Sequence, residues 1–140
     1  MSQANLKLKI IKIIAIFILA FLFNLIWEFF HARFYVHYQG NVITTLILIK
    51  AALFDAALIT LLYVVFLPLT LKKRLILITG ITLVFAVGLE RYALATKRWS
   101  YNSLMPVLPL IDSGLTPTIQ LALLSLLVIF IIEKFYAKAD

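Results

Sequence analysis

The chain has 140 residues, of which 64% are hydrophobic and only 14% are charged, with a net charge of +7. Soluble domains average roughly 45–50% apolar and about 25% charged residues, so this composition is typical of a chain that leaves water for lipid. Cysteine is absent, which excludes disulfides and thiolate sites, and the basic residues fall between apolar stretches instead of forming one stripe, which argues against nucleic acid as a partner.

Four apolar stretches are long enough to cross a bilayer, which requires about 20 apolar residues in a helix. They cover residues 13–32, 51–70, 75–95 and 115–132. A bilayer accepts only helices or closed barrels, and these stretches lack strict alternation. We therefore predict an all-α membrane protein, an antiparallel four-transmembrane-helix bundle, as a single domain over residues 1–140. The first stretch is too long for the apolar region of a signal peptide, so we interpret it as a span.

The distribution of lysine and arginine predicts the orientation. Eight of them lie in the two tails and the connection at residues 72–74, and five lie in or near the other two connections. By the positive-inside rule, both termini are expected in the cytoplasm of a multi-pass protein of the cell (plasma) membrane. Trp27, Trp99 and several tyrosines fall on the opposite side, as in an aromatic belt at the outer interface.

Helix ends and packing residues are also indicated. Thr116, followed directly by a proline, is the expected N-cap of the fourth helix. Small residues, which let membrane helices approach closely, occur at Gly80 and Gly88 in the third stretch and at Ala52 and Ala56 in the second.

The few polar side chains inside the stretches share one depth, near the outer ends. Glu28, Asp55 and Glu90 lie in the first three stretches, and Gln120 lies in the first turns of the fourth. Polar groups inside lipid are costly, so each needs a partner or a function. We therefore predict one outward-facing site in which Glu28, Asp55 and Glu90 are catalytic. The expected substrate-binding residues are Asn24, His31, Arg91, Trp99, Tyr101 and Gln120.

Helical spacing supports this grouping. Asn24, Glu28 and His31 are spaced i, i+4, i+7 and share one face of the first helix. Arg91 points about 100° away from Glu90, toward a neighbouring carboxylate or a headgroup phosphate. The alternative is a structural network that holds the bundle together. In that network the carboxylates would pair with Arg33, Lys50, Arg91 and His31.

Three kinds of function fit such a site. The first is acid–base catalysis on a lipid-soluble substrate, such as an isoprenoid or a lipid headgroup, because a carboxyl group near hydrocarbon can remain protonated and act as a general acid. The second is ion-coupled transport by a dimer, although transporter sites usually lie near the membrane midplane. The third is an accessory subunit without chemistry. Expected partners are membrane lipid and either further copies of the chain or a larger membrane protein.

A metal site is a weaker hypothesis. Glu28 and His31 have the i, i+3 spacing that di-iron carboxylate bundles use, but those proteins use the motif twice. Here Glu90 is followed three residues later by Ala93. We therefore expect no metal and no other cofactor.

The two outer connections leave alternatives open. The long one, residues 91–114, contains Pro106 and Pro109 among bulky apolar residues, which indicates a rigid segment. It is either a lid over the carboxylate site or an anchor in the membrane interface. The later part of the other connection, residues 42–49, either extends the second helix or lies in the interface.

The last third of the chain carries a recognisable pattern. It reads RWxYNxxMPxxP over residues 98–109, followed by GLTPxxQL over residues 114–121. This pattern resembles a signature of small uncharacterised prokaryotic four-helix integral membrane proteins. The resemblance implies a class of fold and no activity.

Overall fold

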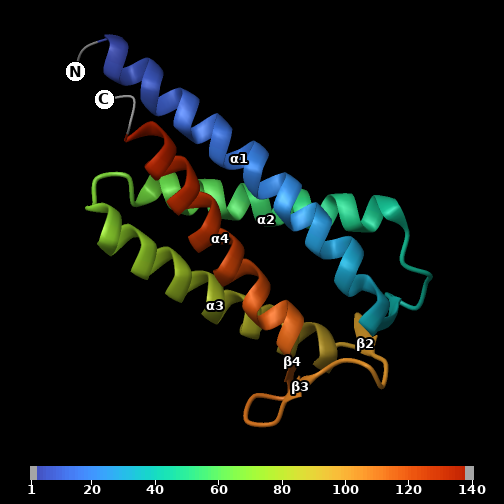
Figure 1. Cartoon of the computed structure of the whole chain (residues 1–140). Helices are drawn as coiled ribbons and strands as arrows, with labels where there is room; N and C mark the ends of the chain where they lie inside the picture. The colour runs from blue at the N-terminus through green and yellow to red at the C-terminus, as the bar shows by residue number, and fades with distance from the viewer. Residues whose placement is uncertain (1–2, 138–140) are drawn as a thin grey trace.

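The computed structural model describes residues 3–137, which are mostly helical. The described chain contains four long helices, α1 (Gln3–His31), α2 (Thr45–Val65), α3 (Leu71–Ala95) and α4 (Leu115–Tyr136). All four are long and apolar enough to cross a membrane. The start of α1, the end of α4 and the α2–α3 turn lie together, at what we call the terminal end (Figure 1). The α1–α2 and α3–α4 connections lie at the opposite, loop end.

The helix ends differ from those of the predicted apolar stretches, and α2 ends at Val65 instead of residue 70. α1 begins at Gln3 instead of residue 13, because lysine and glutamine are good helix formers and continue the helix past its apolar part. α2 begins at Thr45, where the Thr44 hydroxyl accepts a hydrogen bond from the Ile47 N–H at 3.4 Å. The open question about residues 42–49 is thus decided, since the helix includes this segment from Thr45 onward.

The start of α4 differs from the prediction. The N-cap is Gly114, and the prediction that Thr116 caps the helix is wrong. The Thr116 hydroxyl instead donates to the Met105 sulfur at 3.4 Å. A Cβ added to Gly114 would lie only 2.8 Å from that sulfur, so a larger residue here would displace the Met105 side chain. Pro117 is the third helical residue, where a backbone N–H would have no partner inside the helix.

Short strands tie the two loop-end connections together, which the all-α prediction did not include. After the 3₁₀ turn Ala32–Phe34, strand β1 (Tyr35–Tyr38) pairs antiparallel with β2 (Trp99–Tyr101). Aromatic residues favour strands because they pack well across a pleated surface. A second pair, β3 (Val107–Leu108) with β4 (Ser113–Gly114), precedes α4. Because β1 and β2 come from different connections, this sheet joins the loop ends of α1 and α3.

Packing between the helices is uneven. α1 packs mainly against α2 and α4, and α3 packs mainly against α4, whereas α2 and α3 have few contacts with each other. Ala52 and Ala56 are fully buried, as expected of small residues in a helix interface. Gly80 and Gly88 are exposed, and nothing lies within 4 Å of a Cβ built on either, so the predicted close approach of α3 does not occur there.

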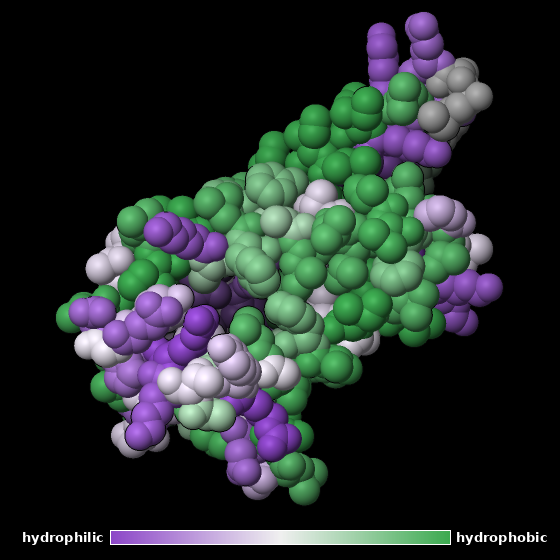
Figure 2. All heavy atoms as spheres, turned by 180° about the vertical axis from the view of Figure 1, so that it is seen from behind, coloured by the Kyte–Doolittle hydropathy of each residue, from purple (hydrophilic) through white to green (hydrophobic). Residues whose placement is uncertain are grey.

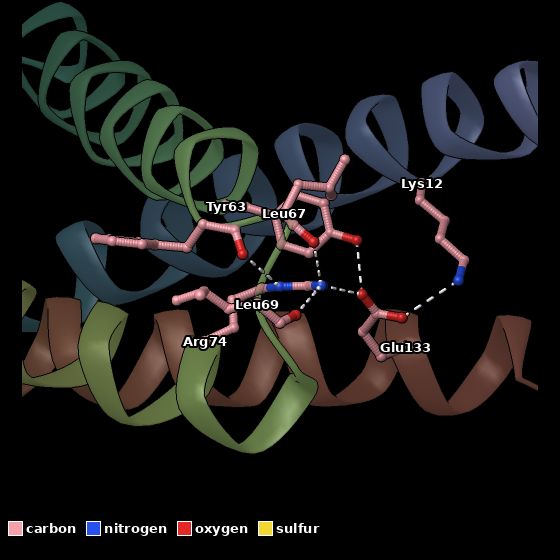
Figure 3. Close-up of polar contacts among 7 residues, drawn as sticks. Lys12, Tyr63, Leu67, Leu69, Arg74 and Glu133 are labelled. Atoms are coloured by element: carbon pink, nitrogen blue, oxygen red, sulfur yellow. Dashed lines mark hydrogen bonds and ion pairs between the residues drawn. The ribbon is translucent and has the colours of Figure 1, made fainter. Parts of the chain in front are cut away.

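A buried charge network closes the terminal end (Figure 3). Arg74, in the first turn of α3, donates to three carbonyl oxygens at the end of α2, those of Phe66, Leu67 and Leu69. Its Nη1 also donates to Oε1 of Glu133 on α4 at 2.5 Å. Arg74 had been counted with the loop lysines, but it is buried and fixes the α2–α3 turn against α4.

Two further side chains complete this network. The Tyr63 hydroxyl donates to Oε1 of Glu133 at 2.6 Å, and Lys12 on α1 forms an ion pair with Oε2 at 3.2 Å. The guanidinium of Arg74 lies over the Tyr63 ring, 4.9 Å from its centroid. One carboxylate therefore connects all four helices at the terminal end.

Candidate functional site

A cavity of about 590 Å³ lies at the loop end, where α2 and α3 separate. All four helices and strands β1 and β2 contribute to its wall. From behind, the molecule shows a hydrophilic hollow in its apolar surface next to the hydrophilic loop end (Figure 2). The predicted site residues in the wall are Glu28, His31, Asp55, Glu90, Trp99 and Gln120. The sequence therefore named six residues, from all four helices and β2, that line the same cavity.

One side chain joins the carboxylates of α1 and α2. Nε2 of Gln120 donates to Oε1 of Glu28 at 2.8 Å and lies 3.2 Å from Oδ2 of Asp55. It also lies 3.2 Å from Oδ1 of Asn24, whose own amide donates to the Ala20 carbonyl. Since both carboxylate oxygens approach one nitrogen, they lie within about 6 Å of each other.

Glu90 belongs to a second group of contacts. Its Oε1 accepts hydrogen bonds from the Tyr35 hydroxyl at 3.1 Å, the Trp99 indole at 2.9 Å and the Tyr101 hydroxyl at 2.5 Å. Burial, followed by the charge of Glu90, raises the pKa of Tyr35 well above its ordinary value. Burial and the hydrogen bond to Glu90 likewise raise the pKa of Tyr101. Both phenols therefore remain protonated donors, and Glu90 fastens the β1–β2 sheet onto α3.

His31 lies between the two groups. Its Nε2 is 3.0 Å from Oε2 of Glu28, and its ring meets the Tyr35 ring edge-on, with the centroids 5.4 Å apart. The side chain is buried, and its Nδ1 has no hydrogen-bond partner among the described residues. The described residues contain no group of three or more histidines and acids that could hold a metal ion, so Glu28 and His31 form only a pair.

The cations predicted to pair with the carboxylates do not do so in the described chain. Arg91 is exposed and does not line the cavity. Among the described residues, Arg91, Arg33 and Lys50 form no ion pair. Of the network that the sequence offered as an alternative, only the contact between His31 and Glu28 is present among these residues. Apart from His31, the groups that contact these acids are amide, phenol and indole donors.

Several residues of the site were not singled out from the sequence. Tyr35 contacts Glu90 and lines the cavity, and Arg98 lines it too. Lys50, which the sequence offered only as an ion-pair partner of the carboxylates, also lines the cavity. Glu133 lies just past the predicted end of the fourth span. The contacts of Glu133 with Lys12 and Arg74 could have been predicted from the sequence, because all three lie at the same end of their spans and an acid near lipid needs nearby donors.

No family model matches the chain, and no curated protein or solved structure matches it significantly. The functional argument therefore depends on the geometry of the cavity.

Proposed function

We propose that the protein is an integral membrane protein whose helices form an antiparallel bundle, with both termini in the cytoplasm. The four apolar helices and their exposed apolar side chains support insertion, because such a surface is unfavourable in water. Hydrophilic residues gather at the loop end and recur at the terminal end, with an apolar zone between them (Figure 2).

The orientation is testable because the chain has no cysteine. A single cysteine introduced as Lys97→Cys marks the loop end, and Lys73→Cys marks the terminal end. In intact cells, a membrane-impermeant thiol reagent should label only the Lys97 variant, and lysis should expose the Lys73 variant. The reverse pattern would contradict the proposed orientation.

We propose further that the loop-end cavity binds a lipid-soluble molecule, such as an isoprenoid, and that the protein is an enzyme that modifies it. The observation that carries this proposal is the pair Glu28 and Asp55, bridged by Gln120 in a cavity whose wall also contains apolar side chains. Its volume lies within the roughly 300–1,000 Å³ of small-molecule sites. The weak packing of α2 against α3 supports lateral entry from the membrane.

The donor count around Gln120 supports acid–base chemistry. Its amide nitrogen carries two hydrogens but faces three acceptors, on Asn24, Glu28 and Asp55. One proton shared between Glu28 and Asp55 supplies the missing donor. The carboxyl group that carries it then acts as general acid, and the other carboxylate acts as general base.

Such a pair shifts a carbon–carbon double bond without an oxidant or a metal ion. The acid adds its proton to one carbon of the double bond, and the base removes a proton from the carbon on the other side of the resulting cation. One proton enters and one leaves, so the product is an isomer. We assign Glu90 to holding the β1–β2 sheet on α3, because its Oε1 accepts three hydrogen bonds from side chains of these strands.

Two measurements test this proposal. Native mass spectrometry of the gently purified protein should show a bound lipid. The lipid should be lost in Ala86→Phe, because Ala86 lines the cavity and the phenyl ring would occupy part of its volume. Lipid extracts of cells producing wild type should contain an altered isoprenoid that cells producing Glu28→Gln lack. A bound lipid indifferent to Ala86→Phe, or identical extracts from the two strains, would contradict binding and catalysis respectively.

Transport fits the structure less well. A transporter needs its site to reach both faces of the membrane in turn. Between the cavity and the terminal end, Ile16, Ile59 and Val128 are fully buried and fill the space between the helices. This packing favours a site that opens only toward the loop end and toward lipid.

A further inference from the structure

We infer that the molecule bound in the loop-end cavity is an anionic amphiphile, whose charged head binds Lys50 and Arg98. This inference rests on the proposed function in that both use the same cavity. It adds the chemical class of the ligand and the direction in which the ligand lies.

The first argument is that two cations in the cavity wall have no ion-pair partner. Lys50 and Arg98 line the cavity together with the carboxylates, yet neither forms an ion pair within residues 3–137. The acids in the wall contact other groups, Glu28 and Asp55 through Gln120 and Glu90 through the β1–β2 sheet. Two cations are therefore available to an incoming anion.

The second argument is that the helix prevents these cations from serving the acids. Lys50 and Asp55 lie five residues apart on α2, so their side chains leave the helix about 140° apart. Lys50 also lies about 7.5 Å closer to the loop end than Asp55. Arg98 follows the end of α3 and lies just before β2, with its guanidinium over the Tyr92 ring at 5.5 Å. The positive charges therefore lie at the mouth of the cavity, and the acid pair lies deeper.

The third argument is the apolar wall beside these charges. Phe54 of α2 and Phe85 of α3 stack with their ring centroids 6.0 Å apart where the two helices separate. Phe54 is half exposed, so this wall continues into the outer apolar surface. If the charged head of the ligand binds at the mouth of the cavity, the start of its apolar tail lies near Glu28 and Asp55. The rest of the tail then lies beside the Phe54 and Phe85 rings and extends into lipid.

The experiment uses the full chain in a neutral detergent and measures binding by native mass spectrometry with three probes. These are hexadecyl phosphate, hexadecanol and inorganic phosphate. We expect hexadecyl phosphate to bind in preference to the other two. Lys50→Gln and Arg98→Gln should each weaken its binding about tenfold, the size of one charge-assisted hydrogen bond. Lys97→Gln is the matched control, an exposed cation next to Arg98 that does not line the cavity, and should leave binding unchanged.

Each other result decides against the inference in a distinct way. Equal binding of hexadecanol, with no effect of Lys50→Gln or Arg98→Gln, would overturn the anionic head and leave the proposed lipid site standing. Binding of inorganic phosphate as strong as that of hexadecyl phosphate would show a site for a free anion. An equal loss in Lys97→Gln would show diffuse attraction instead of a site. If no probe binds while the isoprenoid differs between wild type and Glu28→Gln, this inference fails and the proposed function survives.

Discussion

Replacing Arg74 by alanine tests whether the buried charge network at the terminal end holds the helices together. The substitution removes the donors to the carbonyls of Phe66, Leu67 and Leu69, at 3.3, 2.9 and 3.0 Å. It also removes the closest ion-pair partner of Glu133. These acceptors lie in the α2–α3 turn and on α4, so the loss should weaken the whole terminal end (Figure 3).

The magnitude follows from burial. Removing one partner of a buried ion pair costs about 3–5 kcal/mol, and each buried acceptor left without a donor costs about 1–3 kcal/mol. Glu133 retains Lys12 and Tyr63, and its side chain is 15% exposed, so water and these donors recover part of the loss. We expect Arg74→Ala to lower the free energy of unfolding by about 3 kcal/mol. Arg74→Lys should fall between it and wild type, because an ammonium group lacks the planar fork that reaches several acceptors.

The assay is reversible unfolding in mixed micelles of a neutral detergent and dodecyl sulfate, followed by circular dichroism. Lys73→Ala is the matched control, an exposed neighbour in the same helical turn, and should change stability by less than about 0.5 kcal/mol. If Arg74→Ala and Lys73→Ala differ by less than about 1 kcal/mol, the network does not stabilise the fold and the reasoning is wrong.

Two sets of variants test other parts of the fold. Gly80→Ala should stabilise the protein by about 0.5–1 kcal/mol, since the position is helical and open. Ala52→Leu should destabilise it by about 1–3 kcal/mol, because a larger side chain would overpack this buried helix interface. Unfolding in mixed micelles measures both changes, and equal effects of the two substitutions would refute the packing described. Tyr35 and Tyr101 should ionise only well above pH 10 in the folded protein, whereas they ionise near pH 10 in the unfolded chain. The free energy of unfolding should therefore fall as pH rises past about 10. Tyr35→Phe and Tyr101→Phe should each remove a late phase from the tyrosinate absorbance titration, and a titration complete near pH 10 in wild type would contradict the burial of these phenols.

The candidate site was partly predictable because helix geometry is local. Glu28 and Gln120 lie near the loop ends of long apolar helices, so their shared depth follows from the hydropathy pattern alone. Asp55 was predicted one turn inside the outer end of its helix, but α2 begins at Thr45 and places Asp55 at its middle. The spacing of Asn24, Glu28 and His31 placed them on one face, and all three now take part in one set of contacts.

The partners of these groups were not predictable from hydropathy and spacing. Gln120 lies far along the chain from Glu28, and their contact depends on how α4 crosses α1. Arg74 follows two exposed lysines in sequence, and its burial depends on where α2 ends and on the position of Glu133. Pairing of β1 with β2 likewise depends on how close the helices bring two distant connections.

By itself, the sequence determined four apolar helices and the loop-end position of Glu28, Glu90 and Gln120, because hydropathy and the 3.6-residue repeat act over neighbouring residues. Tertiary structure alone decided that α2 and α3 separate into a cavity and that amide, phenol and indole donors contact its acids. It also decided that Lys50 and Arg98 line this cavity without ion pairs among the described residues. The physical reason is that hydrogen bonds and ion pairs act over about 3–4 Å, so the rotation and crossing of whole helices decide which side chains meet.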